Sequence, residues 1–238
     1  MRDGIAVRGP DAVVPSGHGE RASARVIYDI SQPIGRDTAV WPEDAPVEVD
    51  WTMRRVEGES VNVAAVRMSV HAGTHADGPY HVDDDGVRAG ELPLDAFIGP
   101  ARVMDVRGRD RLDEDVIEGI EPGEEERLLF RTRERVDPER FPTTAMAISP
   151  ALARRIAAAG VRLVGTDAPS VDPLDSKTLD AHHALALAGV AILENLVLDD
   201  VPPGRYTLAA APLRLLEADS APVRAVLVDG ADARREAT

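Results

Sequence analysis

The sequence predicts an α/β fold built as a single domain, with a mixed, strand-rich sheet and flanking helices. Segments with strand character dominate the first third of the chain, and short apolar runs alternate with helical patterns in the rest. Strands that alternate with helices favour parallel pairing, whereas a strand-rich start favours antiparallel pairing, so we expect both kinds in one sheet. The 238 residues are enough for one large hydrophobic core, and no linker interrupts residues 25–230.

The chain begins with a segment for which no regular structure is expected. Residues 1–24 are rich in Gly, Pro, Ser and charged residues and lack hydrophobic periodicity, so we expect a mobile tail followed by one domain over residues 25–238. Three segments then combine β-branched residues with a partial alternation of apolar and polar positions, which indicates strands. They lie at residues 25–31, 47–56 and 60–70.

The rest of the chain alternates apolar runs with two helical patterns. Six runs have the length of buried strands, at residues 101–106, 127–132, 161–167, 190–196, 205–211 and 223–229. The clearer helix covers residues 149–160, where Ser149 is a favourable N-cap, Pro150 suits the first helical position and Gly160 ends the helix. A second helix is expected at about residues 178–188, again followed by glycine.

The composition excludes several classes of partner. The formal net charge of −15 repels phosphate backbones, so we expect no nucleic-acid partner. The chain has no cysteine, which leaves nitrogen and oxygen donors for any metal site and favours ions such as Zn²⁺ or Mn²⁺. No apolar run approaches the roughly 20 residues of a membrane span, and the N-terminus lacks the apolar core of a signal peptide, so we expect no membrane partner and a cytoplasmic location.

The segment HAGTHADGPYH holds three of the six histidines of the chain, His71, His75 and His81, together with Asp77. On a straight strand at about 3.3 Å per residue, the first and the last histidine would lie about 33 Å apart, too far to bind one ion. Two glycines and a proline inside the segment disfavour a continuous helix and allow a bend. The pattern therefore predicts a bent strand end that gathers imidazole and carboxylate ligands around a metal ion.

Further metal ligands must come from elsewhere in the chain. The folded part has one more pair of histidines, His182 and His183, on the second expected helix. Adjacent helical residues point about 100° apart, so one ion engages only one of them, and helical geometry does not say which. Further along, Glu194 interrupts an apolar strand, where a buried carboxylate is costly unless it is paired or binds a cation. The alternative for Glu194 is a solvent-facing position on an edge strand.

The histidine-rich segment resembles the HxGTHxDxPxH signature of the cyclase-like metal-dependent hydrolases. Within that family, residues 165–185 (GTDAPSVDPLDSKTLDAHHAL) and 192–215 (ILENLVLDDVPPGRYTLAAAPLRL) are similar to segments of the bacterial kynurenine formamidases. The likeness runs in matching order from about residue 26 to residue 229. It implies a compact swivelling β/β/α fold, a homodimer, and the hydrolysis of N-formyl-L-kynurenine to L-kynurenine and formate in tryptophan degradation.

The resemblance also implies a set of metal ligands. They are His71, His75, Asp77, His182 and Glu194. Asp77 and Glu194 would bridge two divalent ions, most simply Zn²⁺, with Mn²⁺ as the alternative. The choice of His182 over His183 rests on the twelve-residue interval to the glutamate in the family.

Other residues receive their roles from the same resemblance. His81 would be the catalytic acid and base, and Trp41 would contact the aromatic part of the substrate, with core packing as the alternative for Trp41. Gly78 stands where the family leads us to expect a small residue such as alanine, and we expect this glycine to loosen the turn without removing a ligand. Asp167 and Asp172 lie in an expected loop, where they would hold backbone groups or metal ligands, or serve ordinary turn chemistry.

Other reaction classes find less support in the sequence. The chain has no GxSxG motif and Ser170 has no neighbouring base, so a serine nucleophile is not expected. Lys177, the only lysine, lies near a helix start without the apolar pocket of a Schiff-base lysine, and we expect it on the surface. Two alternatives remain: a relative that hydrolyses another amide or a lactam such as an isatin-type ring, and a non-catalytic metal-holding protein.

Overall fold

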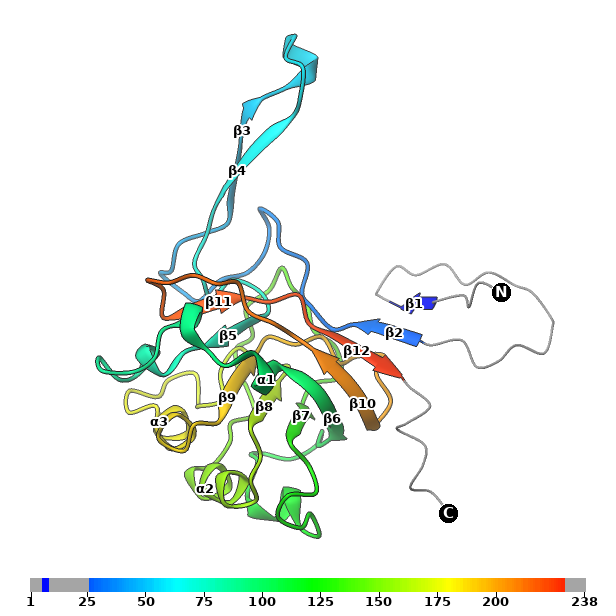
Figure 1. The fold of residues 1–238 in the computed structure, drawn as a ribbon, viewed down its shortest axis with the longest axis vertical. Helices are drawn as coiled ribbons and strands as arrows, with labels where there is room; N and C mark the ends of the chain where they lie inside the picture. Colours follow the sequence, from blue (N-terminus) through cyan, green and yellow to red (C-terminus); the bar gives the residue numbers. More distant parts are fainter. Residues whose placement is uncertain (1–5, 9–25, 230–238) are drawn as a thin grey trace, which may run out of the picture.

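The computed structural model describes residues 6–8 and 26–229, and most of its strands join one mixed sheet (Figure 1). These strands are β1 (Ala6–Arg8), β2 (Val26–Asp29), β5 (His75–Asp77), β6 (Ile98–Asp105), β7 (Arg127–Arg131), β8 (Leu163–Thr166), β9 (Ala191–Glu194), β10 (Gly204–Ala209), β11 (Ser220–Pro222) and β12 (Val226–Asp229). Their order across the sheet is β1-β2-β12-β10-β6-β7-β8-β9-β5-β11.

The sheet combines parallel and antiparallel pairing, as expected. Strands β6, β7, β8 and β9 are parallel neighbours in its centre. β10 and β12 on one side, and β5 and β11 on the other, pair antiparallel with their neighbours. The α/β class with a mixed sheet is therefore confirmed.

Strands β7, β8 and β9 are buried on both faces over almost their whole length, which explains why their sequences are largely apolar. On β7, Leu128 and Phe130 belong to one core and Leu129 to the other. The first core lies between the sheet and the helices α2 (Pro150–Ala158) and α3 (Asp180–Leu187). The second unites residues of β7 and β9 with residues of β2, β10 and β12, so the sheet curls around it.

Both expected helices are present. The Ser149 hydroxyl accepts a hydrogen bond from the backbone N–H of Leu152 at 3.1 Å, and Gly160 follows α2 with φ at 78°, so both signals for the limits of this helix are confirmed. The remaining helical segments are too short to leave a periodic pattern. They are α1 (Leu94–Phe97) and the 3₁₀ segments η1 (Arg55–Glu57), η2 (Pro79–His81), η3 (Ala89–Glu91) and η4 (Glu114–Ile117).

Two of the expected strands form a separate hairpin. β3 (Glu48–Met53) and β4 (Val63–Arg67) pair with each other in a two-stranded sheet. Figure 1 shows this hairpin projecting away from the body of the molecule. It connects the segment of Trp41 to the segment of His71, so its two ends are anchored beside the predicted site.

The expected N-terminal tail falls largely outside the described residues. Within it, the structure describes only β1, whose residues pair in parallel with β2; no strand is expected there from the sequence. Residues 1–5, 9–25 and 230–238 are not described. Among the residues that are described, no helix has both the length and the apolar character needed to cross a membrane.

Candidate metal centre

The residues of the histidine-rich segment are gathered by a bend in the chain. His75 and Asp77 lie two residues apart on β5, so both side chains point to the same face of the sheet. Before β5, Gly73 adopts φ 65°, a left-handed conformation that favours glycine, and the His71 ring lies with its centroid 4.9 Å from that of His75. After β5, η2 carries His81, whose ring centroid lies 4.6 Å from that of His71.

The neighbouring strand and helix supply two more side chains. Glu194 ends β9 directly opposite His75 in the antiparallel register and is only 3% exposed. Because β9 lies between β8 and β5, the edge-strand alternative for Glu194 is wrong. On α3, His182 is buried and His183 is exposed, so the structure brings only His182 to the cluster.

The hydrogen bonds of the rings determine which nitrogen faces the cluster. The Nδ1 atom of His75 lies 2.9 Å from the backbone carbonyl oxygen of Gly73. A carbonyl oxygen only accepts, so this nitrogen carries the hydrogen, and the Nε2 atom of the neutral ring presents a lone pair. That is the form in which an imidazole binds a metal ion.

His182 and His71 are held in the same manner by carboxylates. The Nδ1 atom of His182 lies 2.7 Å from Asp172 Oδ2, and the Nε2 atom of His71 lies 2.8 Å from Asp219 Oδ2. Asp172 also accepts hydrogen bonds from the backbone N–H groups of Ala181 and His182. The same carboxylate therefore binds the start of α3 and orients the ring of His182. The prediction that Asp172 would hold backbone groups or a metal ligand is thus in keeping with its contacts.

The remaining ring nitrogens face carboxylate oxygens at nearly equal distances. The separations are 3.2 Å for His71 Nδ1 to Asp77 Oδ1, 3.5 Å for His75 Nε2 to Asp77 Oδ1, 3.4 Å for His75 Nε2 to Glu194 Oε2, 3.5 Å for His182 Nε2 to Asp77 Oδ2, and 3.4 Å for His182 Nε2 to Glu194 Oε1. The atoms form two groups that share Asp77: one with His71 and His75, the other with His182 and Glu194.

This donor set fits two divalent cations. The Nε2 atom of His75 and both oxygens of Asp77 are buried without a hydrogen-bond partner, which is costly in a folded protein. Ligand atoms held about 2.1 Å from a tetrahedral Zn²⁺ ion lie about 3.4 Å from one another. The observed 3.2–3.5 Å matches that spacing in both groups, so one cation in each would satisfy the unpartnered atoms.

Without cations, protons compensate the buried negative charge. Burial disfavours the charged imidazolium of His71, but the carboxylates of Asp219 and Asp77 outweigh it and raise the pKa of His71 to about 10. For Asp77, burial opposes ionisation, yet the neighbouring histidines hold the pKa of this carboxyl well below its usual value. The carboxylates of the cluster therefore favour bound positive charge, and metal binding would displace protons from the histidines.

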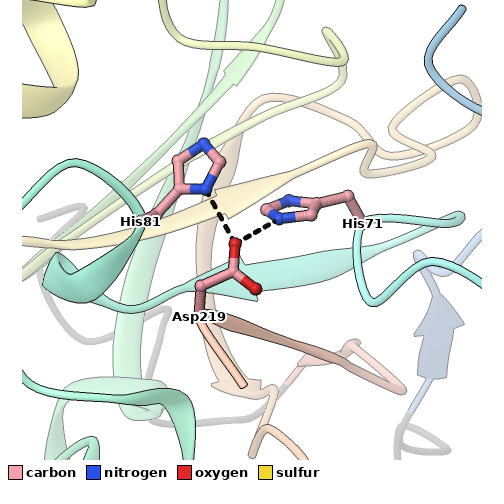
Figure 2. Close-up of side chains that lie close together, drawn as sticks. All are labelled: His71, His81 and Asp219. Atoms are coloured by element: carbon pink, nitrogen blue, oxygen red, sulfur yellow. Dashed lines mark hydrogen bonds and ion pairs between the residues drawn. The ribbon is translucent and has the colours of Figure 1, made fainter. Parts of the chain in front are cut away.

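Asp219 joins two of the histidines from outside the metal groups (Figure 2). One of its oxygens, Oδ2, lies 2.8 Å from His71 Nε2 and 2.9 Å from His81 Nδ1. These hydrogen bonds lower the pKa of Asp219 well below its usual value, so the carboxylate stays charged and accepts a hydrogen bond from the N–H of each ring. His81 is thereby left with a free Nε2 atom.

A cavity of about 380 Å³ opens over the cluster. His71, His75 and His81 line it. Trp41 lines it as well and is 38% exposed, so it is part of the cavity wall and not of the core. Its ring meets that of Phe141 edge-on, with centroids 5.1 Å apart and an interplanar angle of 76°. The cavity thus combines the imidazole groups of the cluster with an aromatic wall.

The expectation that Gly78 loosens the turn is wrong. A Cβ atom at this position would lie 2.8 Å from the backbone oxygen of Val87 and 2.9 Å from that of Asp219. The Gly78 N–H donates to the same Asp219 oxygen at 2.8 Å. The glycine is therefore a close-contact point that holds β5 against the segment carrying Asp219.

The structure adds residues to the site that the sequence analysis did not identify. Asp219 is one of 42 acidic residues and lies 148 positions after His71, so no pattern distinguishes it. Phe141 offered a weak signal, since aromatic residues make up only 3% of the chain. Gln32 and Asn195 also line the cavity, where Gln32 Nε2 donates to Asn195 Oδ1 at 3.3 Å.

Comparison with known protein families and proteins identifies relatives of this chain. The family model Cyclase, described as "Putative cyclase", covers residues 28–173. A protein of Salinibacter ruber named kynurenine formamidase is 49% identical over 209 residues, which are 87% of this chain and 99% of that protein.

Solved structures share the fold. One described as a "predicted metal-dependent hydrolase from Bacillus stearothermophilus" has a TM-score of 0.75 and 31% identity, and the match covers 87% of this chain and all of that one. Isatin hydrolase A from Labrenzia aggregata has a TM-score of 0.72 and 23% identity, with 86% of this chain and 93% of that chain covered. At that identity the second likeness concerns the fold alone.

Proposed function

The chain belongs to the cyclase family, and we propose that it acts there as a kynurenine formamidase, hydrolysing N-formyl-L-kynurenine to L-kynurenine and formate in tryptophan degradation. The observation that carries the proposal is the cluster of buried, unpartnered donor atoms on the floor of a cavity with an aromatic wall. A metal-dependent attack on an aryl formamide uses both features. The likeness to a named formamidase over nearly its whole length supports this substrate over a lactam.

The five proposed ligands are His71, His75, Asp77, His182 and Glu194, and they suit two divalent ions, most simply Zn²⁺, with Mn²⁺ as the alternative. When bound, such ions supply a nucleophilic water near neutral pH and polarise the carbonyl of the substrate. Asp77 would bridge the ions because it belongs to both groups of donor atoms. Glu194 would do so because its two oxygens face different histidines, His75 and His182.

His81 is the proposed catalytic acid and base. Its Nδ1 proton is held by Asp219, so its Nε2 atom is the site that takes and returns a proton. Hydrolysis of the formamide needs a base for the attacking water and then an acid for the departing aryl amine, and an imidazole nitrogen can serve as both because it accepts a proton and returns it. The Asp219 carboxylate is a positioning group in this scheme, since it fixes the tautomer and the ring orientation.

Trp41 is the proposed contact for the benzene ring of the substrate. Together with Phe141 it gives the cavity an apolar wall, and aromatic pairs favour offset or edge-to-face contacts. A ring held there places its attached formamide within the same cavity as His81 and the metal ligands.

The test is a direct assay of the purified protein. With zinc supplied, N-formyl-L-kynurenine should be converted to kynurenine, followed by absorbance; a chelator should abolish the conversion and added zinc should restore it. A panel with other aryl amides and isatin addresses the lactam alternative. A protein that holds two ions but hydrolyses isatin and leaves N-formyl-L-kynurenine intact would contradict the proposed substrate, and metal binding without any turnover would support the non-catalytic alternative.

We propose a homodimer on the evidence of the β3–β4 hairpin. Val49 and Trp51 lie on one face of β3, opposite Val66 and Ala64 of β4, and Trp51 and Val66 are 51% and 59% exposed. An isolated two-stranded hairpin is marginally stable in water, and a one-sided apolar face needs a cover. A second copy of the chain is the cover that the family resemblance implies. The cytoplasmic location stays a prediction.

A further inference from the structure

Three cationic side chains line the same cavity as the metal cluster. They are Arg133, Arg140 and Lys177. Among the residues that the structure describes, none of the three forms an ion pair or a side-chain hydrogen bond. The chain has a net charge of −15 and 42 acidic residues, so free cations gathered in one cavity are unexpected. Lys177 is the only lysine of the chain.

Exposure places Arg140 and Lys177 at the mouth of the cavity, whereas Arg133 is half-buried. The metal-ligand side chains His75 and Glu194 are nearly inaccessible on its floor. Trp41 and Phe141 are partly exposed, and Arg140 and Lys177 are exposed. The cavity therefore combines the buried donor atoms of the cluster with an aromatic wall and with positive charge that reaches its mouth.

Two acidic residues complete the rim. Asp137 lies on the same segment as Arg133 and Arg140, and Asp44 lies beside Trp41; both line the cavity. In each carboxylate, Oδ1 accepts a neighbouring backbone N–H, from Glu139 and Ala45 respectively. Each therefore keeps a second oxygen that can accept a hydrogen bond from a ligand.

Arg133 is the cation whose backbone is fixed to the protein core. It is half-buried, and its backbone N–H donates at 3.0 Å to Asp167, a fully buried carboxylate that also binds the backbone N–H of Thr132. The start of the rim segment is thus fixed to the core. A cation that is less exposed to solvent is less screened, so Arg133 should bind an anionic group more strongly than Arg140 or Lys177 does.

We propose that this rim recognises the α-amino acid group of the substrate: Arg133, Arg140 and Lys177 bind its carboxylate, and Asp44 and Asp137 bind its ammonium group. The inference rests on the proposed function, whose substrate carries a formamide, a benzene ring and an amino acid group in that order. The cavity presents a complementary set of side chains for each of these three groups. The rim would make the enzyme select zwitterionic aryl formamides over neutral ones.

The test compares N-formyl-L-kynurenine with formanilide, an aryl formamide without the amino acid group. kcat and KM are measured for both substrates in the zinc-loaded wild type and in Arg133→Gln, Arg140→Gln and Lys177→Gln. The matched control is Arg135→Gln, which removes the same charge from an exposed residue of the same segment that does not line the cavity.

The KM for N-formyl-L-kynurenine should rise about tenfold or more in Arg133→Gln and about threefold in the two exposed variants, because hydrogen bonds to charged groups weaken with exposure. The kinetics on formanilide should stay within about twofold, which also shows that each variant is folded. Arg135→Gln should change neither substrate.

Two outcomes separate this inference from the proposed function. If the wild type hydrolyses both substrates and the variants change the two KM values equally or not at all, the rim is not an amino acid site and the inference is overturned alone. If the zinc-loaded wild type hydrolyses neither formamide, the proposed function fails and the inference falls with it.

Discussion

Asp77 contributes an oxygen to both groups of donor atoms, whereas His81 belongs to neither group that contains Asp77. We therefore expect Asp77→Ala to lose bound metal and turnover together. His81→Ala should keep its metal and lose about 10²–10⁴-fold in kcat, the usual contribution of a general acid and base. Metal content by elemental analysis and kcat from the kynurenine assay check both variants. A metal-free His81→Ala protein would instead make His81 a ligand.

A substitution of Asp219 tests whether the orientation of the His81 ring contributes to catalysis. Replacing Asp219 with Asn keeps the shape but removes the charge that holds the Nδ1 proton of His81. The expected result is a fall of about 10–100-fold in kcat with a smaller change in KM, as for other groups that orient a functional histidine. The pH profile of kcat should shift at the same time. Asp84→Asn, at an exposed position, is the matched control. Unchanged kcat in Asp219→Asn would leave this carboxylate with a purely structural role.

The titration of Asp167 should make the free energy of unfolding depend on pH. Burial raises the pKa of Asp167 to about 6, although Thr132 and Arg133 donate hydrogen bonds that favour its charged form. The folded protein therefore binds this proton more tightly than the unfolded chain does, and the free energy of unfolding should fall as the pH rises from about 4 to 6. At about 1.4 kcal/mol per pKa unit, the loss from this group is on the order of 3 kcal/mol.

Urea unfolding of the chelated wild type and of Asp167→Asn across that pH range measures this loss. Titrations of the histidines occur in both proteins and cancel in the difference. The Asn variant should lack the fall assigned to Asp167, whatever its stability at a single pH. Parallel curves for the two proteins would show that Asp167 titrates at its ordinary pKa.

At the scale of elements, the contact between β5 and the segment before β11 depends on one missing Cβ atom. We expect Gly78→Ala to push apart backbone atoms that now lie 2.8–2.9 Å from the position of its Cβ. This shift would move Asp219 relative to His81, so the melting temperature and kcat should both fall. Thermal unfolding and the kynurenine assay check this prediction. Gly35→Ala, where no atom lies within 4 Å of the added carbon and φ, as at Gly78, is not in the left-handed region, controls for the general cost of losing a glycine. Equal effects of the two substitutions would argue against a special role for the contact at Gly78.

The elements with strong local signals could be predicted from the sequence. The helix from Pro150 was marked at both ends by Ser149 and Gly160, and the central strands by apolar runs. β5 and β11 have three residues each, too few to show a period, and their pairing depends on contacts between distant parts of the chain. The predicted start of α3 is two residues too early because its N-cap, Leu179, offers no capping side chain, and the first helical N–H groups donate instead to the distant Asp172.

The site could be predicted only in part, because some of its residues are brought together only by contacts between distant parts of the chain. The proposed ligands follow a motif with fixed spacing, and the structure brings all five into one cluster. Asp219 and the rim residues Arg133 and Arg140 belong to loops whose positions are set by the sheet order. Their residue types are common in this chain, so only the folded structure distinguishes them from solvated surface.

At the scale of the whole molecule, the projecting hairpin is the place where a second copy would bind (Figure 1). Replacing Trp51 and Val66 with Glu puts charge on its apolar face, and we expect the dimer to dissociate, as judged by sedimentation equilibrium. Ala65→Glu, whose β3 partner is Asp50 on the other face, should leave the dimer intact. A wild type that is already monomeric at micromolar concentration would refute the proposed assembly.

The hairpin also links assembly to the site. Its two ends continue into the segments of Trp41 and His71, so a partner that immobilises the hairpin would also steady one wall of the cavity. The dissociated variant should therefore show a higher KM for N-formyl-L-kynurenine while keeping its metal.

The measurement that tests the central claim most directly is a crystal structure of the zinc-loaded protein with anomalous diffraction data. The account predicts two zinc peaks per chain, with Asp77 and Glu194 shared between them, His71 and His75 on one ion, His182 on the other, and His81 bonded to Asp219 and to neither ion. A single peak, or a zinc ion bound by His81, would contradict it.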